Sequence, residues 1–205
     1  MNIKLKKSDI VLSLIIGEVT AWYFFYILKN FSAGFKFFSL ILWSLPVVFP
    51  ILSLIGIWIA FLIGQKLLFV FQLAKFALIG VIATLIDLGI LAFLIHTSGI
   101  DAGIWYSVFK GSSFLIATCS KYFGDKLWAF EKKEMTGVGL EFGKFFIVTL
   151  GGLLINVGIA SLVVNVLGPQ FGLNPELWAN IGGIIAAFGT VIWNFAGYKF
   201  LVFKK

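Results

Sequence analysis

Hydrophobic residues fall in six long runs, separated by short segments that carry lysine, glycine and acidic residues. A helix needs about 20 apolar residues to cross a bilayer, with a usual range of about 17–25. Every run reaches that range, so the pattern predicts six transmembrane helices. The runs are Ile10–Leu28, Phe37–Gly64, Phe76–Ile95, Ile104–Ser120, Phe145–Leu167 and Leu177–Tyr198.

Two of these runs differ from a simple apolar span. The second is too long for a straight crossing and contains Pro46 and Pro50, so we expect a kinked or tilted helix. The fourth is the most polar, because it contains Lys110 and several hydroxyl side chains. We expect it to be buried among the other helices rather than to face lipid.

Composition supports a membrane protein and argues against an enzyme. Of the 205 residues, 60% are hydrophobic and 12% are charged, whereas a soluble domain carries about 25% charged residues. The longest hydrophilic stretch, 125–141, is too short to fold alone. With one cysteine and one histidine in the chain, we expect no catalytic residues, no metal site and no cofactor.

The net charge of +7 comes entirely from lysine. Because the lysines flank the apolar runs, they indicate membrane orientation and contact with anionic lipid rather than nucleic-acid binding. If all six runs span, every lysine except Lys29, Lys36 and Lys110 lies on one side. Positive residues collect in the cytoplasm. We therefore expect both termini there, with connections 96–103 and 168–176 on the outside.

The chain also repeats itself. At an offset of 69 residues, Lys75-Phe76 matches Lys144-Phe145, and at an offset of 73 the segment Lys121–Lys126 matches Asn194–Lys199. Chance likeness between apolar segments is the alternative, but the matching lysines and glycines make it the weaker explanation. Each copy has two helices, so both run in the same direction and form a parallel repeat.

The repeat suggests a division of the chain. Four helices form a duplicated two-helix hairpin within residues 71–205, with copies at about 72–132 and 141–205. Residues 1–70 have no counterpart and are predicted to be an added pair of helices. The expected fold is thus an all-α integral membrane protein with about six transmembrane helices.

Four polar positions inside the predicted spans stand out. Counting at 1.5 Å per residue, Asp87 and Lys110 lie about 13 Å and about 9–10 Å from the outer ends of adjacent helices, close enough to form an ion pair. They either line a polar groove where Lys110 meets a lipid phosphate, or fix the hairpin as a structural pair. The second copy has Asn156 at the position of Asp87. Glu18, mid-span, also needs a partner, and Lys66 and Lys110 are both open candidates.

Repeat-equivalent residues stand at the predicted cytoplasmic helix ends. Lys126 corresponds to Lys199, and Lys121 corresponds to Asn194. Any single lysine there is expected to be an anchor that extends to the interface. As a set, together with Lys110, these residues could hold the anionic head group of a lipid, because lysine binds phosphate with three donors.

Four segments resemble the GtrA-like family of small membrane proteins, in the family's order over about residues 72–205. They are Lys75–Gly89, Ser120–Phe130, Lys144–Phe145 and Trp193–Phe203, the last with an Asn-Phe-x-x-x-basic-x-x-Val-Phe ending. In the first copy, Lys121 replaces the Asn that the family tends to have. The resemblance implies a role in cell-surface polysaccharide synthesis in a prokaryotic plasma (inner) membrane.

The family's members are thought to flip a polyprenyl-phosphate-linked sugar across that membrane, so the resemblance makes such a flippase the leading interpretation. An alternative is a non-transporting anchor or scaffold for a membrane glycosyltransferase. A third is a small multidrug or ion transporter that uses Asp87 or Glu18. The expected partners are the sugar lipid and the membrane, with a glycosyltransferase and a homo-oligomer left open and no nucleic acid.

Overall fold

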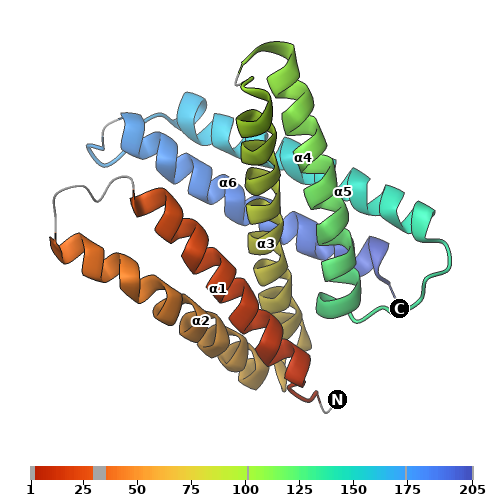
Figure 1. The fold of residues 1–205 in the computed structure, drawn as a ribbon. Coiled ribbons are helices and arrows are strands. Elements are labelled where there is room, and N and C mark those ends of the chain that lie inside the picture. Colours follow the sequence, from red (N-terminus) through yellow and green to blue (C-terminus); the bar gives the residue numbers. More distant parts are fainter. Residues whose placement is uncertain (1–2, 30–35, 101, 174, 205) are drawn as a thin grey trace. The chain divides into compact units, whose positions relative to one another are not determined.

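The computed structural model describes residues 3–29, 36–100, 102–173 and 175–204, and regular structure there is helical throughout (Figure 1). The all-α fold is therefore confirmed. The helices are α1 Lys7–Lys29, α2 Lys36–Gly64, α3 Leu68–Ser98, α4 Gly103–Gly124, α5 Val138–Ser161 and α6 Pro175–Gly197, with π-helical turns η1 Asp125–Ala129, η2 Leu162–Leu167 and η3 Tyr198–Val202.

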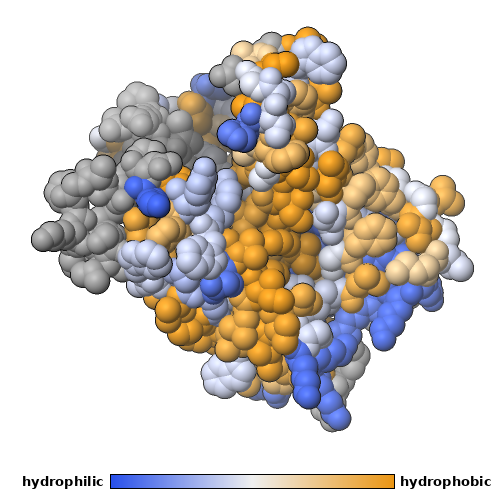
Figure 2. All heavy atoms as spheres, viewed as in Figure 1, coloured by the Kyte–Doolittle hydropathy of each residue, from blue (hydrophilic) through white to orange (hydrophobic). Residues whose placement is uncertain are grey.

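Five helical segments of the described chain are long and apolar enough to cross a membrane. They are Lys7–Lys29, Ile41–Gly64, Leu68–Ser98, Val138–Leu167 and Ile181–Val202. Large apolar side chains such as Val47 and Leu154 are exposed, and Figure 2 shows hydrophobic residues over much of the visible face. This is the surface of a multi-pass membrane protein. The fourth predicted span is helical as α4 but is not among the five, in keeping with its polar character. The expectation that it is buried is wrong, because large apolar side chains such as Ile104 and Leu115 are exposed.

Two compact units make up the chain, residues 1–131 and 132–205. The first unit contains α1 to α4 and η1, and the second contains the remaining helices. The predicted division at residue 70 remains a prediction, but within the first unit the added pair packs onto the first hairpin through contacts of α1 and α2 with α3.

Close backbone contact holds α1 against α2. The Ser53 hydroxyl donates to the Ser13 carbonyl oxygen (2.7 Å). A Cβ atom at Gly17 would lie 2.6 Å from the Cα atom of Pro50, so only glycine fits there without displacement. α2 runs through Pro46 and Pro50 as one helix.

Both hairpins end in the same local structure, a closely packed glycine followed by a π-helical turn. Gly124 lies against the Ile79 side chain and Gly197 against Val148, at the offsets of 73 and 69 that the repeat predicts. Each glycine is followed by a π-helical turn, η1 in one copy and η3 in the other. The turns close with a backbone hydrogen bond from Phe130 to Asp125 (2.9 Å) and from Phe203 to Tyr198 (2.7 Å).

A buried ion pair joins α1 to α3. The Asp9 carboxylate is fully buried and lies 2.8 Å from the Lys75 ammonium, whose side chain is 2% exposed. The Trp128 indole, from η1, donates to the same carboxylate (2.7 Å), and Lys75 also lies over the Phe71 ring, 4.3 Å from its centroid. Two charges leave water here, which is tolerable only because each has an opposite charge or hydrogen-bond partner.

Glu131 extends this network towards the surface. It accepts hydrogen bonds from Lys6 (2.5 Å) and Lys75 (3.2 Å), and its backbone adopts φ 52°, a conformation that non-glycine residues seldom take. Burial alone would raise the pKa of the Glu131 carboxyl, but the hydrogen bonds and positive charges of Lys6 and Lys75 outweigh it and hold the pKa below its usual value. Three segments distant in sequence are thereby tied together.

Replacing Lys75 with Met should destabilise the protein strongly. The substitution leaves the Asp9 charge buried without its cation, and breaking one partner of a buried pair costs about 3–5 kcal/mol. The matched control is Lys144→Met, at the repeat-equivalent but exposed position, which should change the free energy of unfolding by no more than about 0.5 kcal/mol. Unfolding in detergent micelles would measure both; equal effects would contradict the buried-pair account.

Candidate functional site

The predicted intramembrane ion pair is present in the first hairpin. The Lys110 ammonium, on α4, lies 2.5 Å from one carboxylate oxygen of Asp87, on α3. The Ser113 hydroxyl, one turn after Lys110, donates to the other oxygen (2.6 Å). Both carboxylate oxygens therefore have a partner, and the hairpin positions all three groups because 110 and 113 share a helix face.

Exposure differs between the two charged groups. The Lys110 side chain is 42% exposed and that of Asp87 is 18% exposed. In a helix that faces lipid or other helices, a lysine so exposed remains accessible to a second anion while Asp87 compensates its charge. This combination makes the pair a candidate binding site as well as a structural link.

The equivalent place in the second hairpin is polar but uncharged. The Asn156 amide donates to the Thr190 hydroxyl (3.0 Å), which in turn donates to the Ala186 carbonyl oxygen (2.8 Å). Position 186 corresponds to Ser113 and position 183 to Lys110, and they hold alanine and glycine. The structure thus keeps the predicted difference between the copies: one has an ion pair and the other has a neutral hydrogen bond.

Lys121 and Lys126 lie together at the end of the first hairpin. Lys121 pairs with Asp125 (2.6 Å) and lies over the Phe76 ring, 3.9 Å from its centroid. Lys126 is fully buried and donates to the Tyr122 hydroxyl (3.4 Å). In this conformation Lys126 is closed to a head group, whereas the Lys121 side chain is 17% exposed.

Lys110 is separate from that cluster. Eleven residues along α4 separate Lys110 from Lys121, which corresponds to about 16 Å at 1.5 Å per residue. The three predicted head-group ligands of the first unit, Lys110, Lys121 and Lys126, therefore do not form one site. Lys110 marks the intramembrane part of the hairpin, and Lys121 and Lys126 mark its end.

In the second unit, Asn194 lies near the end of α6 and Lys199 lies in the turn η3 that follows. The side-chain oxygen of Asn194 is buried without a hydrogen-bond partner among the described residues, and a Cβ at Gly152 would overlap its amide group. Lys199 is half-buried and lies 5.6 Å from the centroids of both the Phe195 and Phe200 rings. Tyr198 stacks on Phe145 (4.2 Å between centroids) in the place that Asp125 occupies in the first copy.

Glu18 does not use either predicted partner. It accepts a hydrogen bond from the Trp22 indole one turn later on α1 (2.7 Å) rather than pairing with Lys66 or Lys110. The physical reason is proximity, because residues four apart on a helix face each other. Sequence reasoning also missed Asp9, Trp128 and Glu131, whose partners come from distant segments.

Asp125 should make stability depend on pH. Burial raises the pKa of its carboxyl from 3.8 to about 6, although the charge and hydrogen bond of Lys121 oppose the shift. Because the folded-state pKa is the higher one, the folded protein binds more protons between about pH 4 and pH 6. The free energy of unfolding therefore falls as the pH rises through this window.

The test compares the original chain with Asp125→Asn. Between about pH 4 and pH 6.5, the original chain should lose up to about 3 kcal/mol of unfolding free energy relative to the variant. This figure follows from about 1.36 kcal/mol per pKa unit. Glu131 contributes with the opposite sign, since its pKa is lowered, and it cancels in the difference. A pH-independent difference would show that Asp125 is not held in this environment.

Comparison with known proteins gives one match. The family described as GtrA/DPMS, transmembrane domain, matches residues 75–203, which is more than half of the chain. No curated protein and no solved structure matches. The match begins at Lys75 and includes nearly all of both hairpins and all three π-helical turns, while α1, α2 and the start of α3 lie before it. The chain therefore belongs to the GtrA/DPMS transmembrane domain family.

Proposed function

We propose that this protein moves polyprenyl-phosphate-linked sugars across the plasma membrane of a prokaryote for modification of cell-surface glycans. Family membership supports a role in polyprenyl-linked sugar and glycan biosynthesis. Translocation, the lipid carrier and the orientation with cytoplasmic termini are the parts that the proposal adds. The substrate combines a charged phosphate with a long hydrocarbon chain, so the protein has to lower the cost of moving only the head group.

The observation that carries the proposal is the half-exposed Lys110 beside Asp87. An unpaired phosphate inside the bilayer is costly, as is an unpaired ammonium. When the site is empty, Asp87 compensates Lys110. When a phosphate enters the site, the Lys110 ammonium can move from the Asp87 carboxylate to the phosphate. The positive charge of Lys110 then has an anionic partner throughout.

Ser113 allows that exchange. Its hydroxyl bonds to the Asp87 oxygen that Lys110 does not use, so Asp87 keeps one hydrogen bond while the ammonium turns to the phosphate. The hydrocarbon chain needs no protein pathway, because the neighbouring Leu115 and Ile116 side chains of α4 are exposed and apolar. In this mechanism the head group passes along the polar side of the first hairpin and the chain remains in lipid.

The rival function is an anchor for a glycosyltransferase. The added helices favour it, because the Asp9–Lys75 pair holds α1 firmly on the hairpin and would let a stable pair of helices present a docking surface. An anchor of this kind has no need for an exchangeable intramembrane cation. The two functions therefore differ in what they require of Lys110 and Asp87.

Replacing both members of the pair separates these functions. The double substitution Asp87→Leu with Lys110→Met removes both charges together, so no charge remains unpaired and the fold should persist. In proteoliposomes loaded with a fluorescent polyprenyl-phosphate sugar, we expect at least about a tenfold loss of translocation, because one charge-assisted contact contributes about 1.5–3 kcal/mol.

Lys29→Met is the matched control, since it removes one exposed lysine of the same unit and should leave the translocation rate unchanged. Unaltered translocation in the double variant would refute the role of the pair. No translocation by the original chain would refute the flippase itself and favour the anchor.

A further inference from the structure

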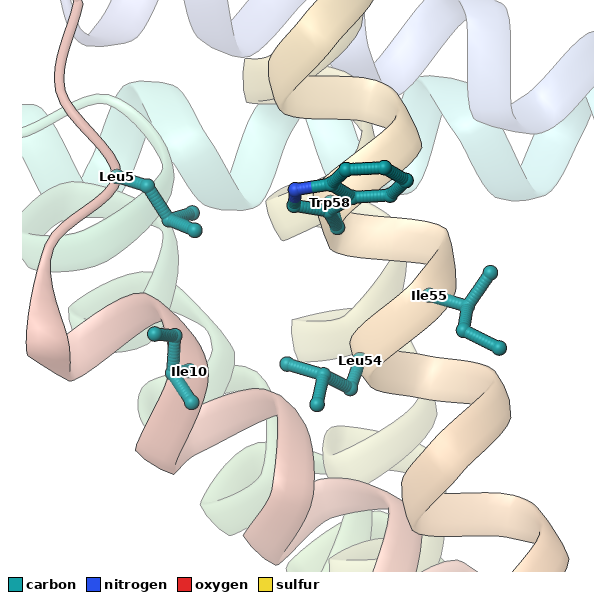
Figure 3. Close-up of a pocket in the computed structure, with 5 residues that line it drawn as sticks. All are labelled: Leu5, Ile10, Leu54, Ile55 and Trp58. Carbon is teal, nitrogen blue, oxygen red and sulfur yellow. The ribbon is translucent and has the colours of Figure 1, made fainter.

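An apolar groove lies between the start of α1 and the second half of α2 (Figure 3). Its volume is about 340 Å³, and the side chains that line it are Leu5, Ile10, Leu54, Ile55 and Trp58. Ile55 and Trp58 are 45% and 51% exposed, so the groove opens to the surroundings of the helices. Such a lining offers contact to a hydrocarbon chain, and its one side-chain hydrogen-bond donor is the Trp58 indole.

Lysines gather at one end of this groove. α1 begins at Lys7 and α2 ends at Gly64, where the Ile3 side chain lies 3.2 Å from the position of a Cβ on Gly64. This contact places Lys4 beside the end of α2. Lys66 follows that end by two residues. Lys4, Lys7 and Lys66 are all exposed.

The nearby acids are already engaged. Asp9 is buried against Lys75, and Glu131 pairs with Lys6 and Lys75. The positive charge of the three exposed lysines is thus left for a ligand from outside the unit. An apolar groove that ends in a positive cluster is complementary to a molecule with one anionic head and one hydrocarbon chain.

We propose that this groove binds an anionic phospholipid of the surrounding leaflet, with its phosphate at Lys4, Lys7 and Lys66 and one acyl chain along Leu54 and Trp58. Trp58 fits this position because an indole ring suits the boundary between chain and head group. Anionic leaflet lipids are abundant and attract each nearby lysine by about 1 kcal/mol, so bulk phospholipid is favoured over a scarce carrier lipid. The site lies within residues 1–70, outside the family match and apart from Lys110.

Quenching of Trp58 fluorescence by brominated lipid tests the site in the full chain. The protein is reconstituted in vesicles that contain either dibrominated phosphatidylglycerol or dibrominated phosphatidylcholine at the same fraction. The Trp58 signal is the difference between the original chain and Trp58→Phe. We expect the apparent affinity of this signal for phosphatidylglycerol to exceed that for phosphatidylcholine at least about fivefold, the effect of one lysine near an anionic surface.

Two triple variants with equal charge change provide the control. Lys4→Gln, Lys7→Gln and Lys66→Gln together should abolish the preference. Lys133→Gln, Lys144→Gln and Lys204→Gln remove three exposed lysines of the other unit and should retain it. Equal quenching by both lipids, equal loss in both triple variants, or displacement of the phosphatidylglycerol signal by trace unlabelled polyprenyl phosphate would each overturn the proposal.

Discussion

A charge inside an apolar helical protein has to be paired, and the first unit of this chain is organised around that constraint. Asp9 and Lys75 are both almost completely buried and lie 2.8 Å apart, so α1 and α3 cannot separate without each charge losing its partner. Trp128 adds the end of the hairpin to the same contact. One ion pair therefore fixes the added helices on the part of the chain that carries the family match.

The same constraint explains how the two copies of the hairpin differ. The first copy has Asp87 with Lys110 and Asp125 with Lys121, each pair within one unit. The second has Asn156 with Thr190, and Tyr198 with Thr149, so the local backbone design is kept while the charges are lost. The second copy forms a helical hairpin without these charges, so the hairpin itself does not require them.

Much of the fold could be predicted from the residues because it depends on local properties. Long apolar runs predict helices, and depth along a helix predicts that Asp87 meets Lys110. The Asp9 contact could not be predicted in the same way, since its Trp128 partner lies 119 residues away and α1 has no counterpart in the repeat. The sequence does contain one indication of it. Asp125, Trp128 and Glu131 correspond to Tyr198, Leu201 and Lys204, so the residue types at this end of the first copy differ from those of the second.

Burial was the second property that sequence alone did not reveal. Lys126 and Lys199 are equivalent in the repeat, yet the first is fully buried beside Tyr122 and the second is partly exposed. Equivalence in a repeat therefore predicts position along a helix but not access to a ligand.

The proposed exchange requires the cation of the intramembrane pair to stand on α4, where it can leave Asp87 for a phosphate. Exchanging the two residues, Asp87→Lys with Lys110→Asp, tests this most directly, because it keeps one charge of each sign and moves the cation to the less exposed position on α3. The proposed exchange predicts that this variant has an unfolding midpoint close to that of the original chain. Its translocation rate for a polyprenyl-phosphate sugar should be at least about tenfold lower. An exchanged pair that translocates at the original rate would contradict it.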